Sequence, residues 1–304
     1  MKTTAQSLAM APAAAQSWLA VFGELVKARL TFLVLLTTLV GFYIGTRELM
    51  DYTLLVHTLF GTALMACGAS ALNQLAEREH DARMRRTESR PLPSGRLQPE
   101  TVLIFGGVCS VAGLLYLALA VNLLTSLIGA FTLVTYVFLY TPLKRVTWLN
   151  TAVGAVPGAL PPLMGWTAAR NELTGEGWSL FAILFFWQIP HFLAIAWMYR
   201  EEYQKAGFVM LPSIDPQGYR TGRQAVSHSL ALLLVSLTPF LFRLAGPLYL
   251  AGALALGVVF LGYAGNFSRH LTVPRARQLF FASIMYLPLL LGLMVLDKLR
   301  NGAP

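Results

Sequence analysis

Apolar runs long enough to cross a membrane recur along the whole chain, and they limit its possible folds more than any other feature. A helix needs roughly 20 apolar residues to span the hydrocarbon layer of a bilayer. Only 12% of the 304 residues are charged, about half the share usual in soluble domains. The chain is therefore expected to be all-α, a polytopic membrane helix bundle. We expect about nine transmembrane helices, at 30–47, 52–75, 101–120, 123–140, 149–168, 178–198, 225–243, 247–266 and 278–296.

The lysine and arginine residues predict an orientation in the membrane. If the N-terminus is cytoplasmic, 18 of the 23 basic residues fall on the cytoplasmic side, in agreement with the positive-inside rule. We therefore expect the N-terminus in the cytoplasm and the C-terminus outside. Because the basic residues lie in short segments between apolar runs, the net charge of +9 does not indicate a nucleic-acid partner. The expected partner is the lipid bilayer.

The start of the chain differs in composition from the rest. Residues 1–24 are rich in small side chains, and no uninterrupted apolar core of signal-peptide quality precedes their Ala-x-Ala patterns. We expect a mobile cytoplasmic tail there and a single transmembrane domain over residues 25–304. The tail lacks the arginines of a mitochondrial transit peptide, which favours a bacterial protein.

One charged segment, residues 73–96 (NQLAEREHDARMRRTESRPLPSGR), directly follows the second apolar run. On a helix, Asn73, Glu77 and Asp81 lie one turn apart and share a face. Magnesium prefers oxygen ligands and is commonly bound by one or two carboxylates together with substrate phosphates. These three residues are therefore candidate metal ligands at the end of a membrane helix.

Arginines follow these acids closely. Guanidinium groups match phosphate oxygens bidentately, so Arg86 and Arg90 are candidates for binding a diphosphate. The alternative is an ordinary charge-paired helix end, in which Arg78 and Arg85 neutralise the acids. That alternative does not explain the two prolines in residues 91–93, which force an extended turn. The metal-and-phosphate interpretation is therefore preferred.

A second polar segment, residues 186–216, follows the sixth apolar run and lies on the same predicted side of the membrane. It supplies three more carboxylates as candidate metal ligands: Glu201, Glu202 and Asp215. Between the two segments, Lys144 and Arg145 add positive charge to the same face. They are further candidates for binding the diphosphate.

His191 lies inside the sixth apolar run, directly after Pro190. An ionisable residue within a membrane segment is costly and indicates a functional role. The structural alternative, to which we give equal weight, is a neutral histidine that satisfies a backbone carbonyl left free by the proline. Trp187 and Tyr203 are candidates for an aromatic lining near a cationic intermediate. They are equally typical of the aromatic belt at a membrane interface.

Together these motifs resemble the UbiA superfamily of intramembrane prenyltransferases. The Asn73, Glu77 and Asp81 spacing resembles the first acidic motif of that superfamily, and MRRTESRPLPSG resembles its continuation. Three further runs resemble its protoheme IX farnesyltransferase (heme O synthase) branch: YTPLKRVTWLN, GALPPLMGW and WQIPHFLAIAWMYREEYQKAGFVMLP. The resemblance covers residues 25–295. The chain departs from the wider superfamily in having Glu77 for aspartate and Arg-Glu-Glu-Tyr for a second D-x-x-x-D motif.

The resemblance implies transfer of farnesyl from farnesyl diphosphate to a vinyl group of heme b, with addition of water. Mg²⁺ is the implied cofactor, and a heme A synthase or terminal oxidase assembly factors are the implied protein partners. The implied location is the bacterial inner membrane, with the active site facing the cytoplasm. For catalysis we expect Asn73, Asp81, Lys144 and Glu202, and for heme contacts His191, Trp187 and Tyr203.

Two alternatives stay open. A related enzyme acting on a quinone-precursor aromatic acceptor would share the metal and diphosphate residues, and the run around His191 favours heme. A membrane transporter, the alternative from another class, often shows corresponding halves, and the two acidic clusters do follow spans two and six. Transporters bind near the midplane of the membrane, however, whereas both clusters are predicted at one face. That placement favours an interfacial active site.

Overall fold

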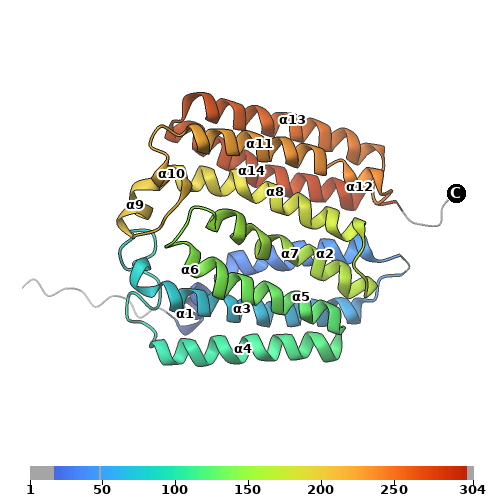
Figure 1. The fold of residues 1–304 in the computed structure, drawn as a ribbon. Helices are drawn as coiled ribbons and strands as arrows, with labels where there is room; N and C mark the ends of the chain where they lie inside the picture. The colour runs from blue at the N-terminus through green and yellow to red at the C-terminus, as the bar shows by residue number, and fades with distance from the viewer. Residues whose placement is uncertain (1–16, 48, 300–304) are drawn as a thin grey trace, which may run out of the picture.

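The computed structural model describes residues 17–47 and 49–299, and this part of the chain folds into helices without any β-strand (Figure 1). The long helices lie side by side and alternate in direction. Their bounds are α2 Ala28–Gly45, α3 Tyr52–Asp81, α4 Pro99–Ala120, α5 Leu123–Val134, α7 Asn150–Arg170, α8 Gly175–Met198, α11 Tyr219–Val235, α13 Pro247–His270 and α14 Val273–Leu296. The shorter elements are α1 Trp18–Leu25, the π-helix η1 Thr135–Tyr140, α6 Thr141–Leu143, α9 Arg200–Lys205, α10 Leu211–Ile214 and α12 Thr238–Leu241.

The expected all-α membrane bundle is confirmed, and each predicted run overlaps one long helix. In the described part of the chain, eight helical segments are long and apolar enough to span a membrane by themselves; α7 is not among them. This helix contains three prolines and packs between α2 and α8, and residues 159–168 are all buried. A helix enclosed by its neighbours needs no apolar surface toward lipid, so its lower hydropathy is tolerated.

Glycine lets helices α2 and α7 approach closely. A Cβ atom added at Gly165 would lie 1.9 Å from the carbonyl oxygen of Thr38, and one added at Gly41 would lie 1.9 Å from that of Pro162. Both distances are far below van der Waals contact, so only glycine fits at these two positions. Small residues of this kind are typical of membrane bundles, in which close packing rather than hydrophobic burial holds the helices together.

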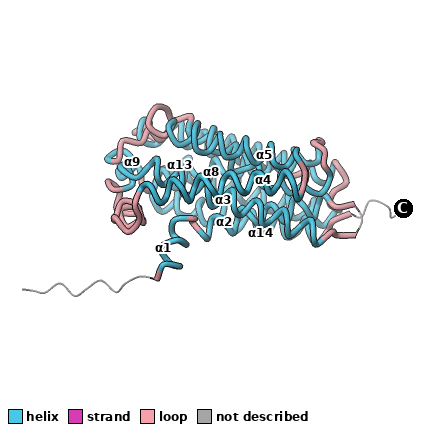
Figure 2. The backbone as a smooth tube through the Cα atoms, turned by 90° about the horizontal axis from the view of Figure 1, so that it is seen from below, coloured by secondary structure: helices cyan, strands magenta, loops and turns pink. Residues whose placement is uncertain are grey.

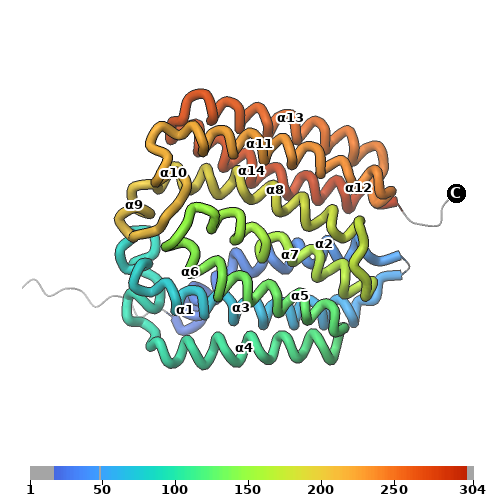
Figure 3. Tube along the Cα trace, viewed as in Figure 1, coloured from blue at the N-terminus to red at the C-terminus, as the bar shows by residue number. Residues whose placement is uncertain are grey.

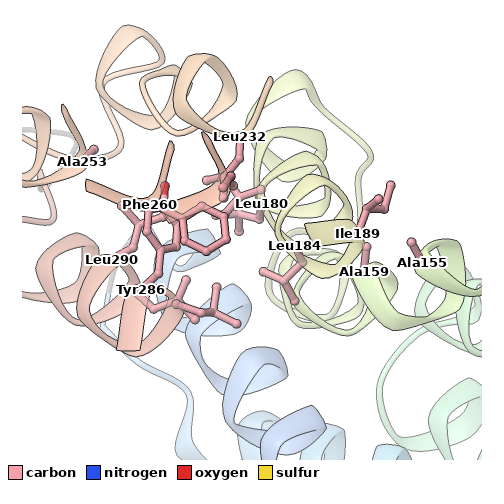
Figure 4. Packing of buried hydrophobic residues seen from close by; sticks show 14 of the residues in the cluster. Ala155, Ala159, Leu180, Leu184, Ile189, Leu232, Ala253, Phe260, Tyr286 and Leu290 are labelled. Atoms are coloured by element: carbon pink, nitrogen blue, oxygen red, sulfur yellow. The ribbon is translucent and has the colours of Figure 1, made fainter. Parts of the chain in front are cut away.

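The largest apolar cluster lies between α8, α11, α13 and α14 (Figure 4). Phe260 and Tyr286 pack with their ring centroids 5.2 Å apart, and Leu180 and Leu232 lie beside them. A second group of buried residues continues this cluster along α7 through Ala155 and Ala159. The C-terminal helices are thereby fixed against α8, which carries one of the predicted functional segments.

Loops and short helices gather at the two ends of the bundle (Figures 2 and 3). One end holds α1, α6, α9 and α10, together with the end of α3 (Figure 1). The end of α14 lies at the other end. The two polar segments and the loop between them therefore meet at one end of the bundle, as predicted. Which side of the membrane that end faces stays a prediction.

Helix α1 changes the boundary of the predicted tail. The tail was expected over residues 1–24, but the chain is helical from Trp18 onward, and residues 1–16 lie outside the described part. Val21 and Leu25 are buried against residues from α3, α4 and the loop between them. In addition, Gln74 Nε2 donates a hydrogen bond of 2.7 Å to the Leu25 carbonyl. These contacts hold the segment against the bundle.

Candidate active site

The end of α3 presents a row of buried oxygen ligands. Asn73, Glu77 and Asp81 lie on successive turns, and their exposed fractions are only 1%, 3% and 1%. Burying two carboxylates is costly unless each is paired and hydrogen-bonded. The environment of this row therefore has to supply positive charge.

Each carboxylate has one cationic partner. Lys144 Nζ lies 2.6 Å from Glu77 Oε1, and Arg90 Nη1 lies 2.6 Å from Asp81 Oδ2. The alternative in which Arg78 and Arg85 neutralise a solvated helix end is wrong, because the two acids are buried and paired elsewhere. Arg78 instead lies 3.8 Å from the exposed Glu79.

Asn73 has partners that the sequence did not indicate. Its Oδ1 accepts hydrogen bonds from Lys27 Nζ at 2.7 Å and from the Tyr136 hydroxyl at 3.3 Å. Its Nδ2 donates to Thr141 Oγ1 at 3.0 Å. Lys27 precedes the first span and was counted only as a topological charge, and the two hydroxyl residues lie within or beside an apolar run. The sequence around Tyr136 and Thr141 does not distinguish these two residues from residues that only pack in a membrane helix.

A π-helix shapes this wall of the site. The turn η1 interrupts the span that begins with α5, and π-turns inside helices are frequent at functional sites. It places the rings of Tyr136 and Tyr140 in a stack with centroids 5.7 Å apart. Lys144 Nζ lies 4.4 Å from the centroid of the Tyr140 ring, within the range of a cation–π contact. One lysine thus joins the aromatic wall to the acidic row.

The two lysines beside the row differ in charge behaviour. Burial, with the nearby charge of Arg90 as the next cause, lowers the pKa of Lys27 to about 7. Burial lowers the pKa of Lys144, but the charge of the adjacent Glu77 carboxylate and then the Tyr140 hydroxyl outweigh it, and the net result is a pKa above the ordinary value. Lys144 therefore keeps its proton at neutral pH, whereas Lys27 titrates near neutrality.

The three predicted segments meet around this row. Arg86 Nη2 donates to the Tyr203 hydroxyl at 3.2 Å, which links the loop after α3 to α9. The Val209 amide donates to the Lys144 carbonyl at 2.7 Å. Met84 packs in one buried cluster with Phe208 and other residues of the second segment. The site is thus enclosed by parts of the chain that are far apart in the sequence.

Four predicted residues are placed elsewhere or differently. Glu201 is exposed, Glu202 is half-buried, and Asp215 Oδ2 accepts hydrogen bonds from the amide and hydroxyl of Thr221 at the start of α11. Arg145 is exposed and donates to the Ala76 carbonyl at 2.7 Å. Over residues 17–47 and 49–299, no three His, Cys, Asp or Glu side chains come together as a metal site. The metal-binding role of these three acids stays a prediction.

Comparison with known proteins decides the family. The model of the UbiA prenyltransferase family matches residues 34–287, most of the chain. The chain belongs to the UbiA prenyltransferase family. A UbiA relative from Solibacter usitatus named protoheme IX farnesyltransferase is 50% identical over 284 residues, covering 90% of this chain and 97% of the relative.

Solved structures agree on the UbiA fold. A digeranylgeranylglyceryl phosphate synthase aligns with a TM-score of 0.79 at 16% identity, covering 92% of this chain and 98% of that one. A UbiA homolog from Archaeoglobus fulgidus bound to DMAPP and Mg²⁺ aligns with a TM-score of 0.66 at 16% identity, covering 90% and 98%. At such low identity these structures show the fold alone.

Two of the three residues predicted to contact the acceptor, Trp187 and His191, lie along α8. His191 Nδ1 lies 2.7 Å from Ser283 Oγ, and the ring stacks between Trp187 and Phe280 with centroids 5.0 Å away on each side. Trp187 Nε1 donates to the Ser283 carbonyl at 2.8 Å. His191 Nδ1 is therefore engaged by α14 rather than by the carbonyl freed by Pro190. Tyr203 lies apart from this stack, at the Arg86 side of the site.

Proposed function

We propose that this chain transfers the farnesyl group of farnesyl diphosphate to a vinyl group of heme b, with addition of water, giving heme O and diphosphate. The observation that carries the prenyl-transfer part is the buried row of Asn73, Glu77 and Asp81 facing lysine and arginine at one end of a membrane bundle. The heme acceptor is supported by the name of the Solibacter usitatus relative.

Mg²⁺ fits the row by the chemistry of its donors. The side-chain oxygens of Asn73, Glu77 and Asp81 each lie 2.6–2.7 Å from a lysine or arginine nitrogen, so this oxygen face already faces basic groups. Hard oxygen donors of this type suit magnesium. When bound there, the ion would neutralise the diphosphate and the charge that builds on it as it leaves. A homolog of the same fold from Archaeoglobus fulgidus is bound to DMAPP and Mg²⁺, which supports a magnesium cofactor but does not identify its ligands here.

The basic residues would hold the diphosphate. Arg90 and Lys144 are already directed toward the row, and binding exchanges their carboxylate partners for phosphate oxygens. Arg86 and Arg145 lie at the exposed rim, where their planar guanidinium groups suit bidentate contact with phosphate. Fixed donors of this kind stabilise the transition state because they need no reorganisation as charge develops.

The chemistry then needs no protein nucleophile. The bond between farnesyl C1 and oxygen breaks with its electron pair on the diphosphate, and the heme vinyl group attacks the resulting allylic cation. The new cation beside the porphyrin ring takes a hydroxyl group from water, which releases one proton to diphosphate or solvent. The stacked rings of Tyr136 and Tyr140 offer electron-rich faces near the departing group. The enclosing helices keep other water away from the first cation.

The primary test is a conversion assay in detergent. Purified protein given heme b, farnesyl diphosphate and Mg²⁺ should form heme O, identified by mass spectrometry, and chelation of the metal with EDTA should abolish the product. Mg²⁺ added back should restore it, which controls for damage by the chelator. If the protein instead prenylates an aromatic-acid quinone precursor and leaves heme b unchanged, the heme assignment is wrong and the alternative acceptor holds.

His191 provides a separate test of the acceptor side. We propose that the stack of Trp187, His191 and Phe280 contacts the heme, because it places a polar ring within an aromatic wall. The His191→Gln variant is expected to bind heme b about tenfold more weakly, a loss of about 1.4 kcal/mol. A titration of the Soret absorbance measures this. The matched control is His228→Gln, a membrane histidine on α11 that bonds to the Gln224 carbonyl. Equal heme affinity in both variants would assign His191 a structural role only.

We also propose that the active-site end faces the cytoplasm of a bacterial inner membrane. The bundle crosses the membrane several times by length and composition, and most lysine and arginine residues lie at the active-site end. An excess of these residues marks cytoplasmic loops. Association with a heme A synthase or with terminal oxidase assembly factors stays a prediction from the family resemblance.

A further inference from the structure

A polar cavity lies at the end of the bundle opposite the active site. It has a volume of about 390 Å³ and lies where the end of α2, the end of α7 and the end of α14 meet. The 18 residues of α2 separate it from Lys27, a distance of about 27 Å at 1.5 Å per residue. The lining includes Tyr43, Arg47, Trp166, Arg170 and Lys298. The mechanism proposed above makes no use of these residues.

Arg170 is the unusual member of this lining. It is the last residue of α7, and its side chain is only 7% exposed. Its Nη1 is buried without a hydrogen-bond partner, and its Nε lies 3.3 Å from Glu172 Oε1. A buried donor left unbonded is costly, and more so when the group is charged. Arg170 thus brings a charged group with unused hydrogen-bonding capacity to the wall of the cavity.

Two ordinary explanations account for part of this arrangement. A cation at the C-terminal end of a helix is stabilised by the helix dipole, and the Arg170 guanidinium lies 4.7 Å from the centroid of the Trp166 ring. Both explain why an arginine is present at this position. Neither explains why one of its donors is buried without an acceptor.

This end of the bundle has few basic residues, and most of them line the cavity. Three of the five basic residues predicted for this side line it: Arg47, Arg170 and Lys298. Glu172 is 3.8 Å from Arg47 and 3.3 Å from Arg170, so one acid serves two guanidinium groups. Lys298 Nζ donates to the carbonyls of Tyr43 and Thr46. Among the described residues that line the cavity, none is acidic.

We propose that this cavity binds the phosphate of an anionic phospholipid headgroup. Arginine beside lysine suits a phosphate, because the guanidinium group offers a planar fork and the ammonium group a point charge. The rim carries exposed apolar and aromatic residues, Leu49, Tyr52 and Leu299, which suit the glycerol and acyl region of the same molecule. Lysine and arginine close to a membrane surface attract acidic lipid headgroups. The volume exceeds what a free phosphate needs.

The test compares Arg170→Gln with Arg243→Gln. Arg243 is an exposed arginine at the same end of the bundle, and it does not line the cavity. Each purified protein is titrated with phosphatidylglycerol, phosphatidylcholine or inorganic phosphate, and native mass spectrometry counts the bound lipid. The original protein and Arg243→Gln should retain one phosphatidylglycerol molecule, and Arg170→Gln should bind it about tenfold more weakly.

Thermal unfolding without added lipid checks that Arg170→Gln is folded. If that variant does not fold, Arg47→Gln replaces it, because Arg47 is a surface side chain of the same cavity. Three results would overturn the proposal. They are equal phosphatidylglycerol affinity in the cavity variant and the original protein, phosphatidylcholine binding as tight as phosphatidylglycerol binding, and occupation by inorganic phosphate that excludes the lipid.

Discussion

Asp81→Asn is expected to lower the rate of prenyl transfer by about 10²–10³-fold while leaving the protein folded, a loss of roughly 3–4 kcal/mol of transition-state stabilisation. Asparagine has nearly the same shape as aspartate and retains one oxygen. It removes the negative charge that the proposed Mg²⁺ site needs and that holds Arg90 at 2.6 Å. Turnover of heme b to heme O at saturating Mg²⁺ measures the effect.

Glu79→Gln is the matched control for this prediction. Glu79 lies on the same helix two residues away, but its side chain is 72% exposed and forms a long ion pair with Arg78 at 3.8 Å. Neutralising it should leave turnover within about twofold, because exposed ion pairs contribute little. If Asp81→Asn also retains turnover within that range, the buried row does not bind the metal or the diphosphate.

The bundle itself was largely predictable from the sequence. Membrane helices must satisfy their own backbone hydrogen bonds and present apolar side chains to lipid, so their positions follow from hydropathy. Helix α7 shows where this reasoning weakens. Its sequence contains three prolines. Contacts with neighbouring helices, such as that of Gly165 with the Thr38 carbonyl, stabilise it in the bundle. A single-sequence pattern does not reveal which helix is enclosed by the others.

The row of Asn73, Glu77 and Asp81 could also be predicted, because a four-residue spacing on a helix places side chains on one face. The residues that pair with this row could not be predicted. The alternative that the sequence analysis set aside paired the acids with Arg78 and Arg85, but Glu77 pairs with Lys144, which is 67 residues away in the sequence. Lys27 reaches Asn73 over 46 residues. Tertiary packing sets such contacts, and no local pattern encodes them.

The π-helix explains why the sequence did not indicate two of the partners of Asn73. Tyr136 and Thr141 meet Asn73 because the backbone between them departs from α-helical spacing. A hydrophobic run with a regular period conceals such a turn. Asp215 has a partner that its sequence position does not indicate. Its Oδ2 accepts hydrogen bonds from the amide and hydroxyl of Thr221 at the start of α11, and its role as a metal ligand stays a prediction.

Lys144→Met is expected to produce the largest loss of stability of any variant at the site. Lys144 and Glu77 form a pair at 2.6 Å, with side-chain exposures of 17% and 5%. Removing one partner leaves the other charge buried without compensation, which costs about 3–5 kcal/mol in comparable pairs. Chemical unfolding in mild detergent, followed by tryptophan fluorescence, measures the free energy of unfolding. Turnover should fall at the same time, because the diphosphate loses a cation.

The double variant Glu77→Gln with Lys144→Met separates these two effects. With both charges removed, no carboxylate is left unpaired, so most of the lost stability should return. Turnover should not return, since the proposed metal site and the diphosphate site have each lost a charged group. A double variant that regains stability and turnover together would show that the pair is structural. One that regains neither would show that Lys144 acts mainly by packing against Tyr140 and Phe208.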